Sequence, residues 1–599
     1  MWSNLSSLLL IGCICFLCIK YLKPQDLKTS GIESDCIRPP GDWRWDLIFI
    51  GVGSLVGAWA MLATLTYSDG NVQFAIGSWS DFGANLSLTQ SLALGNNYPT
   101  EHPFFPGEII HYHFLFWYLA ANLSYLGLNF VWAINLLSFF SLICLLILMM
   151  TFAEQLFNSR AAGRISLIFF FLSSSSLYYI PYLLSQPSLS EAIAAILVRK
   201  VPLISGFPYH GEGWGSLSII TFINQRQLIS AIGVILMVLI ALVMFYRRKG
   251  AFQLIGGSPA SASVLPEVSK SDIATLAFCG VLIGCLPYWN TAVFLSAAVI
   301  VGGLLVLFPF RPYLLALVAA ATVVGLPQIL LLRSGNLVPM GATFFTWGYT
   351  IVDPTAAKVA EYLLWTFGFK LLLIVLAMWF VPSSHRRFFI ALTLPAIVAF
   401  SVQLSVIMVN NHKLLNVWGV VTASYIAYAI WIVAKRFKVA GIALAVIMTL
   451  SLTLGAIIDL FPIHNDAYIG TPYGGDRLTT WVIENTQPTD IFLTEMYLSH
   501  PILMAGRKIF FGNTLLAWGA GYKLQERDSA YKEMFKTNDP SALIDLLHAN
   551  HIKYIAVDDG LRNNENSKSL DESMLFNNFE LVFDDVEKKY GNMKIYSVP

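Results

Sequence analysis

The chain has 599 residues, of which 56% are hydrophobic and only 12% are charged. Ordinary soluble domains carry ~25% charged residues, so this composition excludes a string of soluble domains. It predicts a polytopic α-helical membrane protein instead. The net charge of +1 provides no basic field for nucleic acid and no acidic solvating tail.

Apolar runs recur along the first 462 residues and predict the membrane spans. A helix needs about 20 apolar residues to cross a hydrocarbon core ~30 Å thick. By that rule we expect about twelve spans, near residues 2–19, 46–67, 130–152, 165–181, 228–246, 272–288, 290–308, 312–332, 363–381, 388–409, 417–433 and 439–461. The first run lacks the positive segment and cleavage site of a signal peptide, so a retained anchor fits better, with a cleaved signal as the alternative.

Lysine and arginine residues fall in every second predicted loop and set the orientation, because they concentrate in short cytoplasmic loops. The basic loops lie near residues 20–44, 160–164, 247–249, 311, 386–387 and 435–438. The loop 68–129 and everything after residue 462 are therefore predicted to lie outside the cytoplasm.

The predicted outer loop 68–129 is richer in polar residues than a membrane connector requires. Its stretch DFGANLSLTQSLAL predicts an amphipathic helix on the membrane surface, with one apolar stripe formed by Phe82, Leu86 and Ala93. The stretch 109–128 predicts a second, half-immersed helix. Asp81 can cap the first helix, or it can serve a ligand, and the two roles are compatible.

Four more residues of this loop are candidate ligand-binding groups: Glu101, His102, His111 and His113. On a helix, His111 and His113 would be two positions apart and would not share a face, which weakens a metal pair. The alternative is that these side chains are ordinary loop polarity or interfacial hydrogen-bonding groups.

Two further predicted outer loops carry polar candidates. The loop 182–227 holds His210, Glu212, Gln225 and Arg226, and the short loop 410–416 holds Asn411, His412 and Lys413. A charge at the mouth of a helix bundle is costly unless it is paired or solvated. Arg226 and Lys413 would therefore suit an anionic phosphate, or they could anchor their spans by snorkelling.

The stretch 463–599 is more polar and predicts a small α/β domain outside the membrane, after a transmembrane domain formed by residues 1–462. Strands are predicted at 490–495, 552–559, 579–585 and 593–599. A helix is predicted over 539–551, because Asp539 can cap it and Pro540 suits its first turn.

Acids, histidines and cations thus gather on one side of one bundle, and no single position is specific. Cations there could hold a lipid phosphate while a loop carboxylate takes a proton from an acceptor hydroxyl. That chemistry is inverting glycosyl transfer, in which the acceptor displaces the phosphate from the opposite face of the sugar.

The stretch SDFGANLSLTQSLALGNNYPTEHPFFPGEIIHYHFLFWYLAANLSYLGL, residues 80–128, resembles the first outer loop of GT-C-type integral membrane glycosyltransferases. It is most similar to bacterial members related to protein mannosyltransferases and lipid-linked aminoarabinose transferases. In that superfamily an acidic residue early in this loop is the catalytic base, and Asp81 is the matching position. The motifs NQRQ (224–227) and NNHKLLN (410–416) also resemble outer motifs of related proteins.

The resemblance implies a polyprenyl-phosphate sugar donor, a glycan, lipid or protein acceptor, and a multi-pass protein of the bacterial plasma membrane with its site outside the cytoplasm. Many members carry two adjacent acids in this loop, whereas Asp81 is followed by Phe82. A divalent metal such as Mg or Mn is thus left open.

Two other functions fit part of the pattern. A transporter or flippase of a lipid-linked glycan would share the bundle and the cations, but such proteins tend to show internal repeats and polar mid-span positions. Here no repeat is evident, and Asn290 and Gln403 are the main polar exceptions within spans. A non-catalytic assembly protein would need no acid in the loop.

Overall fold

The computed structural model describes residues 42–173, 177–203, 223–253, 255, 269–335, 344–565, 567 and 570–599. The chain divides into two compact units, residues 1–48 and 49–599. The predicted first span at 2–19 and the candidate residues His210 and Glu212 lie outside the described residues.

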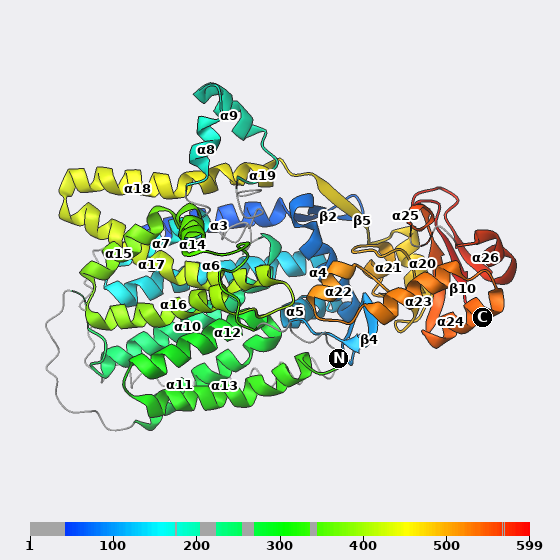
Figure 1. The fold of residues 1–599 in the computed structure, drawn as a ribbon, viewed down its shortest axis with the longest axis horizontal. Helices are drawn as coiled ribbons and strands as arrows, with labels where there is room; N and C mark the ends of the chain where they lie inside the picture. Colours follow the sequence, from blue (N-terminus) through cyan, green and yellow to red (C-terminus); the bar gives the residue numbers. More distant parts are fainter. Residues whose placement is uncertain are drawn as a thin grey trace. The chain divides into compact units, whose positions relative to one another are not determined.

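Long apolar helices make this chain an integral membrane protein (Figure 1). In the described part of the chain, seven helical segments are long and apolar enough to cross a bilayer: Trp43–Leu62 (α3), Phe130–Phe157 (α6), Arg226–Arg248 (α10), Leu286–Leu307 (α12), Arg311–Leu332 (α13), Met408–Arg436 (η4 and α17) and Lys438–His464 (α18 and α19). The predicted count of about twelve spans is not confirmed.

Several predicted spans are shorter or broken in the structure. Helix α7 (Arg160–Phe171) ends before the predicted limit of 181, and α11 (Lys270–Gly284) has 15 residues. The predicted span 363–381 is two helices, α14 (Ala356–Phe367) and α15 (Phe369–Phe380), bent by 87°. Gly368 joins them with a φ of 50° and a ψ of −131°, a conformation that other residues rarely adopt. Helix α16 (Ser383–Ser401) follows.

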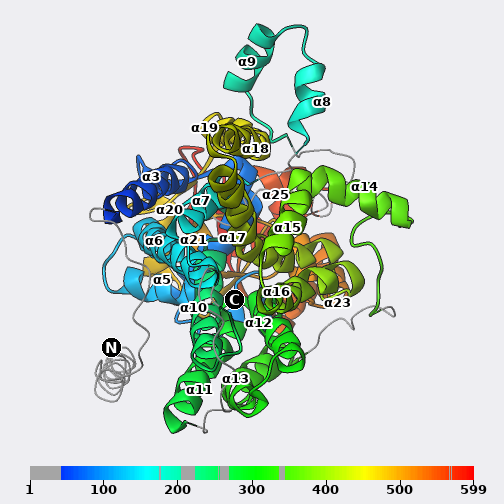
Figure 2. The ribbon, with the colours of Figure 1, turned by 90° about the vertical axis from the view of Figure 1, so that its left-hand side faces the viewer.

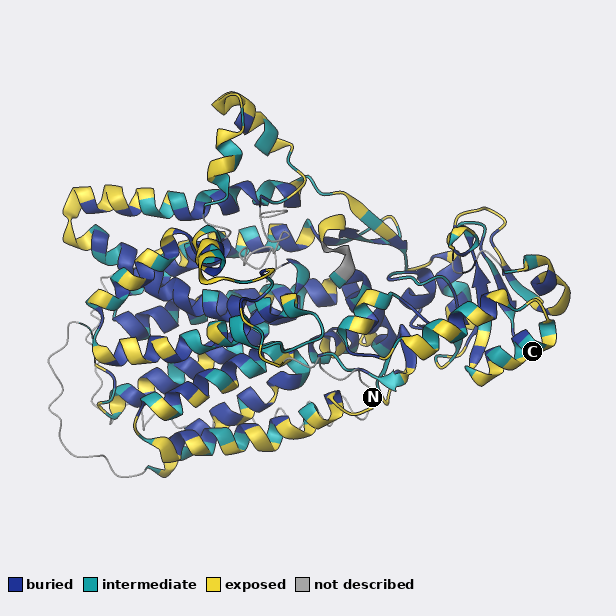
Figure 3. Ribbon diagram, in the orientation of Figure 1, coloured by how far each residue is buried: buried dark blue, intermediate teal, exposed yellow. Residues whose placement is uncertain are grey.

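Helix α17 (His412–Arg436) is the centre of the bundle, in contact with α6, α7, α12, α15, α16 and α18. In its most apolar stretch 78% of residues are buried, against 22% in α13. Figure 2 shows α11 and α13 paired at the edge, and Figure 3 shows the exposed residues along α13 and α18 (Lys438–Ile458). Since exposed apolar side chains are stable in lipid, these two helices form part of the lipid-facing surface.

The predicted outer loop folds into two small sheets and two helices. Its elements are β1 (Leu65–Ser68), β2 (Asn71–Ala75), η1 (Ile76–Ser78), α4 (Trp79–Ala93), β3 (Glu101–His102), β4 (Phe105–Ile109) and α5 (Leu115–Tyr125). The second predicted helix starts at Leu115 rather than at 109, because strand β4 occupies 105–109. His111 and His113 therefore lie on no helix, which corrects the helical spacing assumed from the sequence.

Helix α4 exists as predicted, but the chain itself covers both of its faces. Its apolar residues Phe82 and Leu86 are buried, and so are the polar residues Thr89 and Gln90. The Gln90 amide donates to the Met504 carbonyl oxygen at 3.0 Å. The helix is buried on both its apolar and its polar faces because the chain after residue 462 packs on it.

The stretch after residue 462 is an α/β structure. Its central sheet has the order β7-β6-β8-β10-β9, in which β6, β7 and β8 are parallel and β10 is antiparallel to both neighbours. The strands of this sheet are Ile491–Leu493 (β6), Lys508–Ile509 (β7), Ile552–Val557 (β8), Glu580–Asp584 (β9) and Lys594–Ser597 (β10). A further strand, Tyr468–Pro472 (β5), belongs to another sheet. The four predicted strands are confirmed by β6, β8, β9 and β10.

Helices surround this sheet. They are Arg477–Asn485 (α20), Pro501–Met504 (α21), Thr514–Gly519 (α22), Gln525–Lys536 (α23), Pro540–Ala549 (α24), Asp559–Asn563 (α25) and Glu572–Asn578 (α26), whereas Leu460–His464 (α19) ends the last membrane-spanning segment. Helix α24 is the one predicted from the sequence, and the Asp539 side chain caps it by accepting from the Ser541 amide.

The outer loop and the C-terminal stretch are joined by strand pairing and close packing. Strand β5 pairs antiparallel with β2, so the sheet β1-β2-β5 contains segments 400 residues apart in the sequence. A methyl group added at Gly506, whose φ is +78°, would lie 2.8 Å from the backbone nitrogen of Gly95. A separate domain starting at 463 stays a prediction.

Candidate active site

Asp81 is the third residue of α4, which begins at Trp79, so it is not the N-cap that the sequence suggested. The residue is partly exposed. Burial raises the pKa of its carboxyl from 3.8 to about 6, although the positive charge of Lys413 acts in the opposite direction. Asp81 is thus a carboxylate with the proton affinity of a weak base near neutral pH.

Lys413 lies in the first turn of α17 and is 7% exposed. Its Nζ donates to the Tyr112 hydroxyl at 3.3 Å and lies 5.3 Å from the centre of the Tyr112 ring. In the described part of the chain no carboxylate forms an ion pair with it. The group that contacts its Nζ is the neutral Tyr112 side chain, so the positive charge of Lys413 is available to offset an anion.

His113 and Gln227 support this lysine and tyrosine. The His113 ring lies tilted by 31° against the Tyr112 ring with 3.8 Å between centroids, and its Nε2 is 3.1 Å from the Gln227 amide nitrogen. Burial, together with the charge of Lys413, holds the pKa of His113 well below 6.5. His113 is therefore neutral at pH 7, with Nε2 accepting the amide hydrogen of Gln227.

His412 and Gln225 form a similar pair beside Lys413. The His412 Nδ1 donates to the Val409 carbonyl oxygen at 2.8 Å, which leaves Nε2 to accept from the Gln225 amide at 3.3 Å. Two of the sequence motifs, NQRQ and NNHKLLN, therefore meet in space. Asn411 lies next to them, and its amide donates to the carbonyl oxygens of Ala399 and Val402.

Arg226 is fully buried, so in this structure it cannot contact a lipid phosphate as the sequence suggested. Its guanidinium donates to the Asn135 side chain at 2.8 Å, and to the Met61 carbonyl and the Thr64 hydroxyl at 3.1 Å. It also lies 5.2 Å from the ring centre of Phe82, the neighbour of Asp81. Its contacts tie the ends of α3 and α6 to α4, which makes it a positioning residue.

Glu101 contacts the C-terminal stretch rather than the bundle mouth. Its carboxylate forms an ion pair with Lys508 at 2.8 Å and accepts from the Gly107 amide at 3.1 Å. Burial opposes ionisation of Glu101, but the hydrogen bonds and charge of Lys508 and the Gly107 amide outweigh it, so the pKa is lowered. Glu101 thus joins the β3–β4 hairpin to β7.

His102 and His111 also contact the C-terminal stretch. Their rings lie 5.5 and 4.8 Å from the ring of Tyr522, and the His111 Nδ1 is 3.1 Å from the Leu332 carbonyl oxygen. Burial lowers the pKa of His102 to about 4, and the proximity of His111 adds to this effect. The structure therefore divides the predicted site residues into a group around Lys413 and a group around Tyr522.

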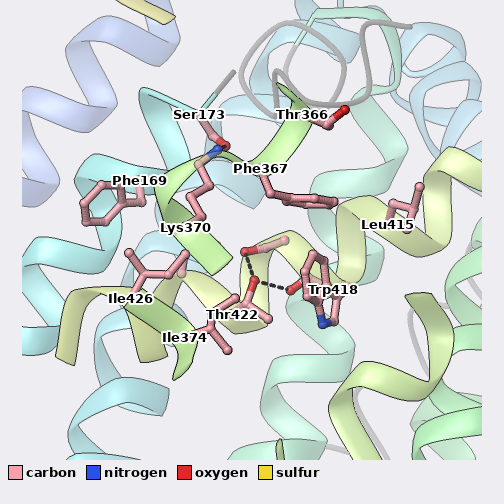
Figure 4. A pocket seen from close by; sticks show the side chains of 12 residues that line it. Phe169, Ser173, Thr366, Phe367, Lys370, Ile374, Leu415, Trp418, Thr422 and Ile426 are labelled. Atoms are coloured by element: carbon pink, nitrogen blue, oxygen red, sulfur yellow. Dashed lines mark hydrogen bonds between the residues drawn. The ribbon is translucent and has the colours of Figure 1, made fainter. Parts of the chain in front are cut away.

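Sequence reasoning missed Tyr112 and Gln227, which complete the group around Lys413, and it also missed Lys370. Lys370 lines a cavity between α7, α15 and α17, and its buried Nζ donates to the Ser173 hydroxyl at 3.0 Å (Figure 4). A single lysine in the apolar run 363–381 was the available signal, because charges within spans are costly.

A metal site is not evident in the described ranges, where no three His, Cys, Asp or Glu side chains gather as they would around an ion. The charge that acts on Asp81 is the cation Lys413 rather than a second carboxylate. The divalent metal left open by the sequence is therefore not confirmed by the described residues.

The fold is similar to that of known glycosyltransferases. The oligosaccharyltransferase of Archaeoglobus fulgidus, tethered to an acceptor peptide, matches with a TM-score of 0.51 at 12% identity over 93% of this chain and 74% of that chain. Its apo form gives 0.50 at 12% identity, covering 86% and 69%. ArnT from Cupriavidus metallidurans bound to undecaprenyl phosphate gives 0.47 at 11% identity, covering 93% and 98%.

No family model and no curated protein matches the chain. The identities to the solved structures are low, so the likeness concerns the fold. At that level the GT-C-type resemblance predicted from the first outer loop is confirmed.

Proposed function

We propose that this protein is a GT-C-type glycosyltransferase that moves a sugar from a polyprenyl-phosphate donor to an acceptor outside the cytoplasm, with inversion. The observation that carries the proposal is that Asp81, a carboxylate of raised pKa, lies within the electrostatic reach of the buried cation Lys413 without a direct ion pair between them. The fold shared with an oligosaccharyltransferase supports it.

The reaction needs one base and one group that offsets negative charge. The Asp81 carboxylate accepts the proton of an acceptor hydroxyl, and the freed oxygen forms a bond to the anomeric carbon of the donor sugar. The bond from that carbon to the phosphate oxygen breaks, and the lipid phosphate leaves with the electron pair. Lys413 and the Tyr112 hydroxyl offset the charge that develops on this phosphate.

The neighbouring residues hold these groups in place. His113 and Gln227 fix Tyr112 from one side, and Gln225 and His412 brace the start of α17. Each of these roles belongs to a residue of the chain itself. Glu101, His102 and His111 face the C-terminal stretch, where they can shape the path of the acceptor.

The decisive experiment is a transfer assay in membranes that contain the protein and a panel of radiolabelled polyprenyl-phosphate sugars. Label should appear in an acceptor with the parent chain and fall to background with Asp81→Asn. A flippase would move the lipid-linked glycan across the bilayer without forming a new glycosidic bond, and would not depend on a base. Transport without transfer would therefore replace the proposed activity by that alternative.

A further inference from the structure

Residues 177–203, described without a gap, form an arm that contains the short helices α8 (Tyr179–Leu184) and α9 (Leu189–Leu197). In two views at right angles, the arm projects from the rest of the chain and runs across the axis of α18 rather than along it (Figures 1 and 2). Within the arm only Ala192 and Leu203 are buried. The arm therefore has no core of its own.

Most of the apolar side chains of the arm are exposed. Seven of them have exposed fractions between 37% and 80%: Ile180, Leu184, Leu189, Ile193, Leu197, Val198 and Val201. Helices of this length are marginal in water without packing, and a dense exposed apolar patch marks an interaction surface. An apolar partner must therefore cover the arm.

The attachment of the arm places it at the edge of the membrane. The Asn465 amide donates to the carbonyl oxygens of Leu197 and Arg199 at 2.8 and 3.0 Å, and the Asp459 carboxylate accepts from the Leu203 amide at 2.6 Å. Asp459 and Asn465 lie at the end of the membrane-spanning segment Lys438–His464. An arm that leaves this end across the helix axis runs along the bilayer surface.

The distribution of polar groups on the arm also fits a position at the edge of the membrane. Arg199 and Lys200 follow α9 at the base of the arm, and the Arg199 guanidinium lies 4.7 Å from the ring centre of Tyr182. Tyrosine, arginine and lysine are typical of the head-group level of a bilayer. The side chains Val446 and Leu450 of α18, the helix that leads to this attachment, are also apolar and exposed.

We propose that the arm 177–203 is a membrane-interface element whose partner is the phospholipid bilayer. The stripe of Leu189, Ile193 and Leu197 lies among the acyl chains next to the head groups, and Arg199 and Lys200 meet the head-group phosphates. The proposal is independent of the glycosyltransferase activity, because it rests on the surface and attachment of the arm alone.

The test uses the full chain in lipid nanodiscs, with a polarity-sensitive fluorophore on Ile193→Cys. Two matched controls carry the same label: Leu450→Cys, which is 56% exposed on α18, and Phe576→Cys, which is 63% exposed on α26. Quenching is measured with spin-labelled lipid and with aqueous iodide. The parent chain is labelled in parallel to correct for its native cysteines.

Quenching of Ile193→Cys by spin-labelled lipid to the level of Leu450→Cys, with weak quenching by iodide, is the expected result. Quenching like that of Phe576→Cys would overturn the proposal. Shielding from both quenchers at every protein-to-lipid ratio would also overturn it, because a second copy of the chain would then be the cover. If Ile193→Cys does not fold, Leu184→Cys, which is 80% exposed, replaces it with the same expected result.

Discussion

Replacing Asp81 by Asn should stabilise the protein while it removes the proposed activity. The Asp81 carboxyl has a pKa of about 6 in the folded chain against an ordinary value of 3.8. Folding therefore favours the protonated form. The resulting stabilisation is fully present below pH 3.8 and is lost as the pH rises through 6, so the parent chain bears the full cost of a buried charge above pH 6.

The size of this cost follows from the shift in pKa. The difference between 6 and 3.8 is 2.2 units, and at ~1.36 kcal/mol per unit this gives about 3 kcal/mol as an upper limit. Because Asp81 is partly exposed, and because a carboxylate in the first turn of a helix gains ~0.3–1 kcal/mol, we expect a net gain of about 1–2 kcal/mol for Asp81→Asn at pH 8.

The assay compares the thermal unfolding of parent and variant in lipid at several pH values, beside the initial rate of sugar transfer. The midpoint of Asp81→Asn should exceed that of the parent at pH 8, and the difference should shrink toward pH 4. Transfer should fall by ~10²–10⁴, the usual contribution of a positioned base. A lower midpoint at pH 8 would refute the desolvation of Asp81, and transfer at the parent rate would refute its role as the base.

The transfer rate of the parent should fall about tenfold per pH unit below about pH 6 as Asp81 becomes protonated, and a flat profile between pH 5 and 7 would contradict the role of this carboxylate. Lys413→Gln should weaken donor binding by ~1.5–3 kcal/mol, measured as a rise in the donor Kd, while Lys413→Arg keeps most of the affinity. Arg226→Gln should act in the opposite way, lowering the unfolding midpoint with no change in donor Kd, since its guanidinium is fully buried and bonded within the chain. Gly506→Ala should lower stability by ~1–3 kcal/mol more than Gly127→Ala, because both positions have a positive φ but only the new methyl group at 506 meets backbone atoms; equal losses would show that the contact with α4 is loose.

The sequence predicted the parts of the fold that depend on local pattern. Apolar runs located most of the long helices, and strand-forming stretches with turn residues located β6, β8, β9 and β10. The 87° bend between α14 and α15 was not predicted, because Gly368 lies in an unbroken apolar run and a glycine there is also compatible with a straight span. The burial of α4 was missed because its partner lies 400 residues away in the sequence.

The sequence predicted which charged residues belong to the candidate site, but it did not predict their contacts. Asp81 and Lys413 share one region, as the sequence suggested, since both carry charge at the same end of the bundle. Arg226 has the same chemistry as Lys413, and only the positions of Asn135 and Thr64 show that it is enclosed. Tyr112 and Gln227 carry no charge in a chain rich in aromatic and amide side chains, and the motif NQRQ drew attention to Gln225 and Arg226 rather than to Gln227.

The pairing of β2 with β5 and the close contact of Gly95 with Gly506 have a consequence for the exchange of parts between related chains. A cut at residue 462 would leave β2 with an open edge and expose the polar face of α4. A working chimera must exchange residues 65–114 and 463–599 together. Selection on either segment therefore acts on both, and the two segments should be inherited as one block that is discontinuous in the sequence.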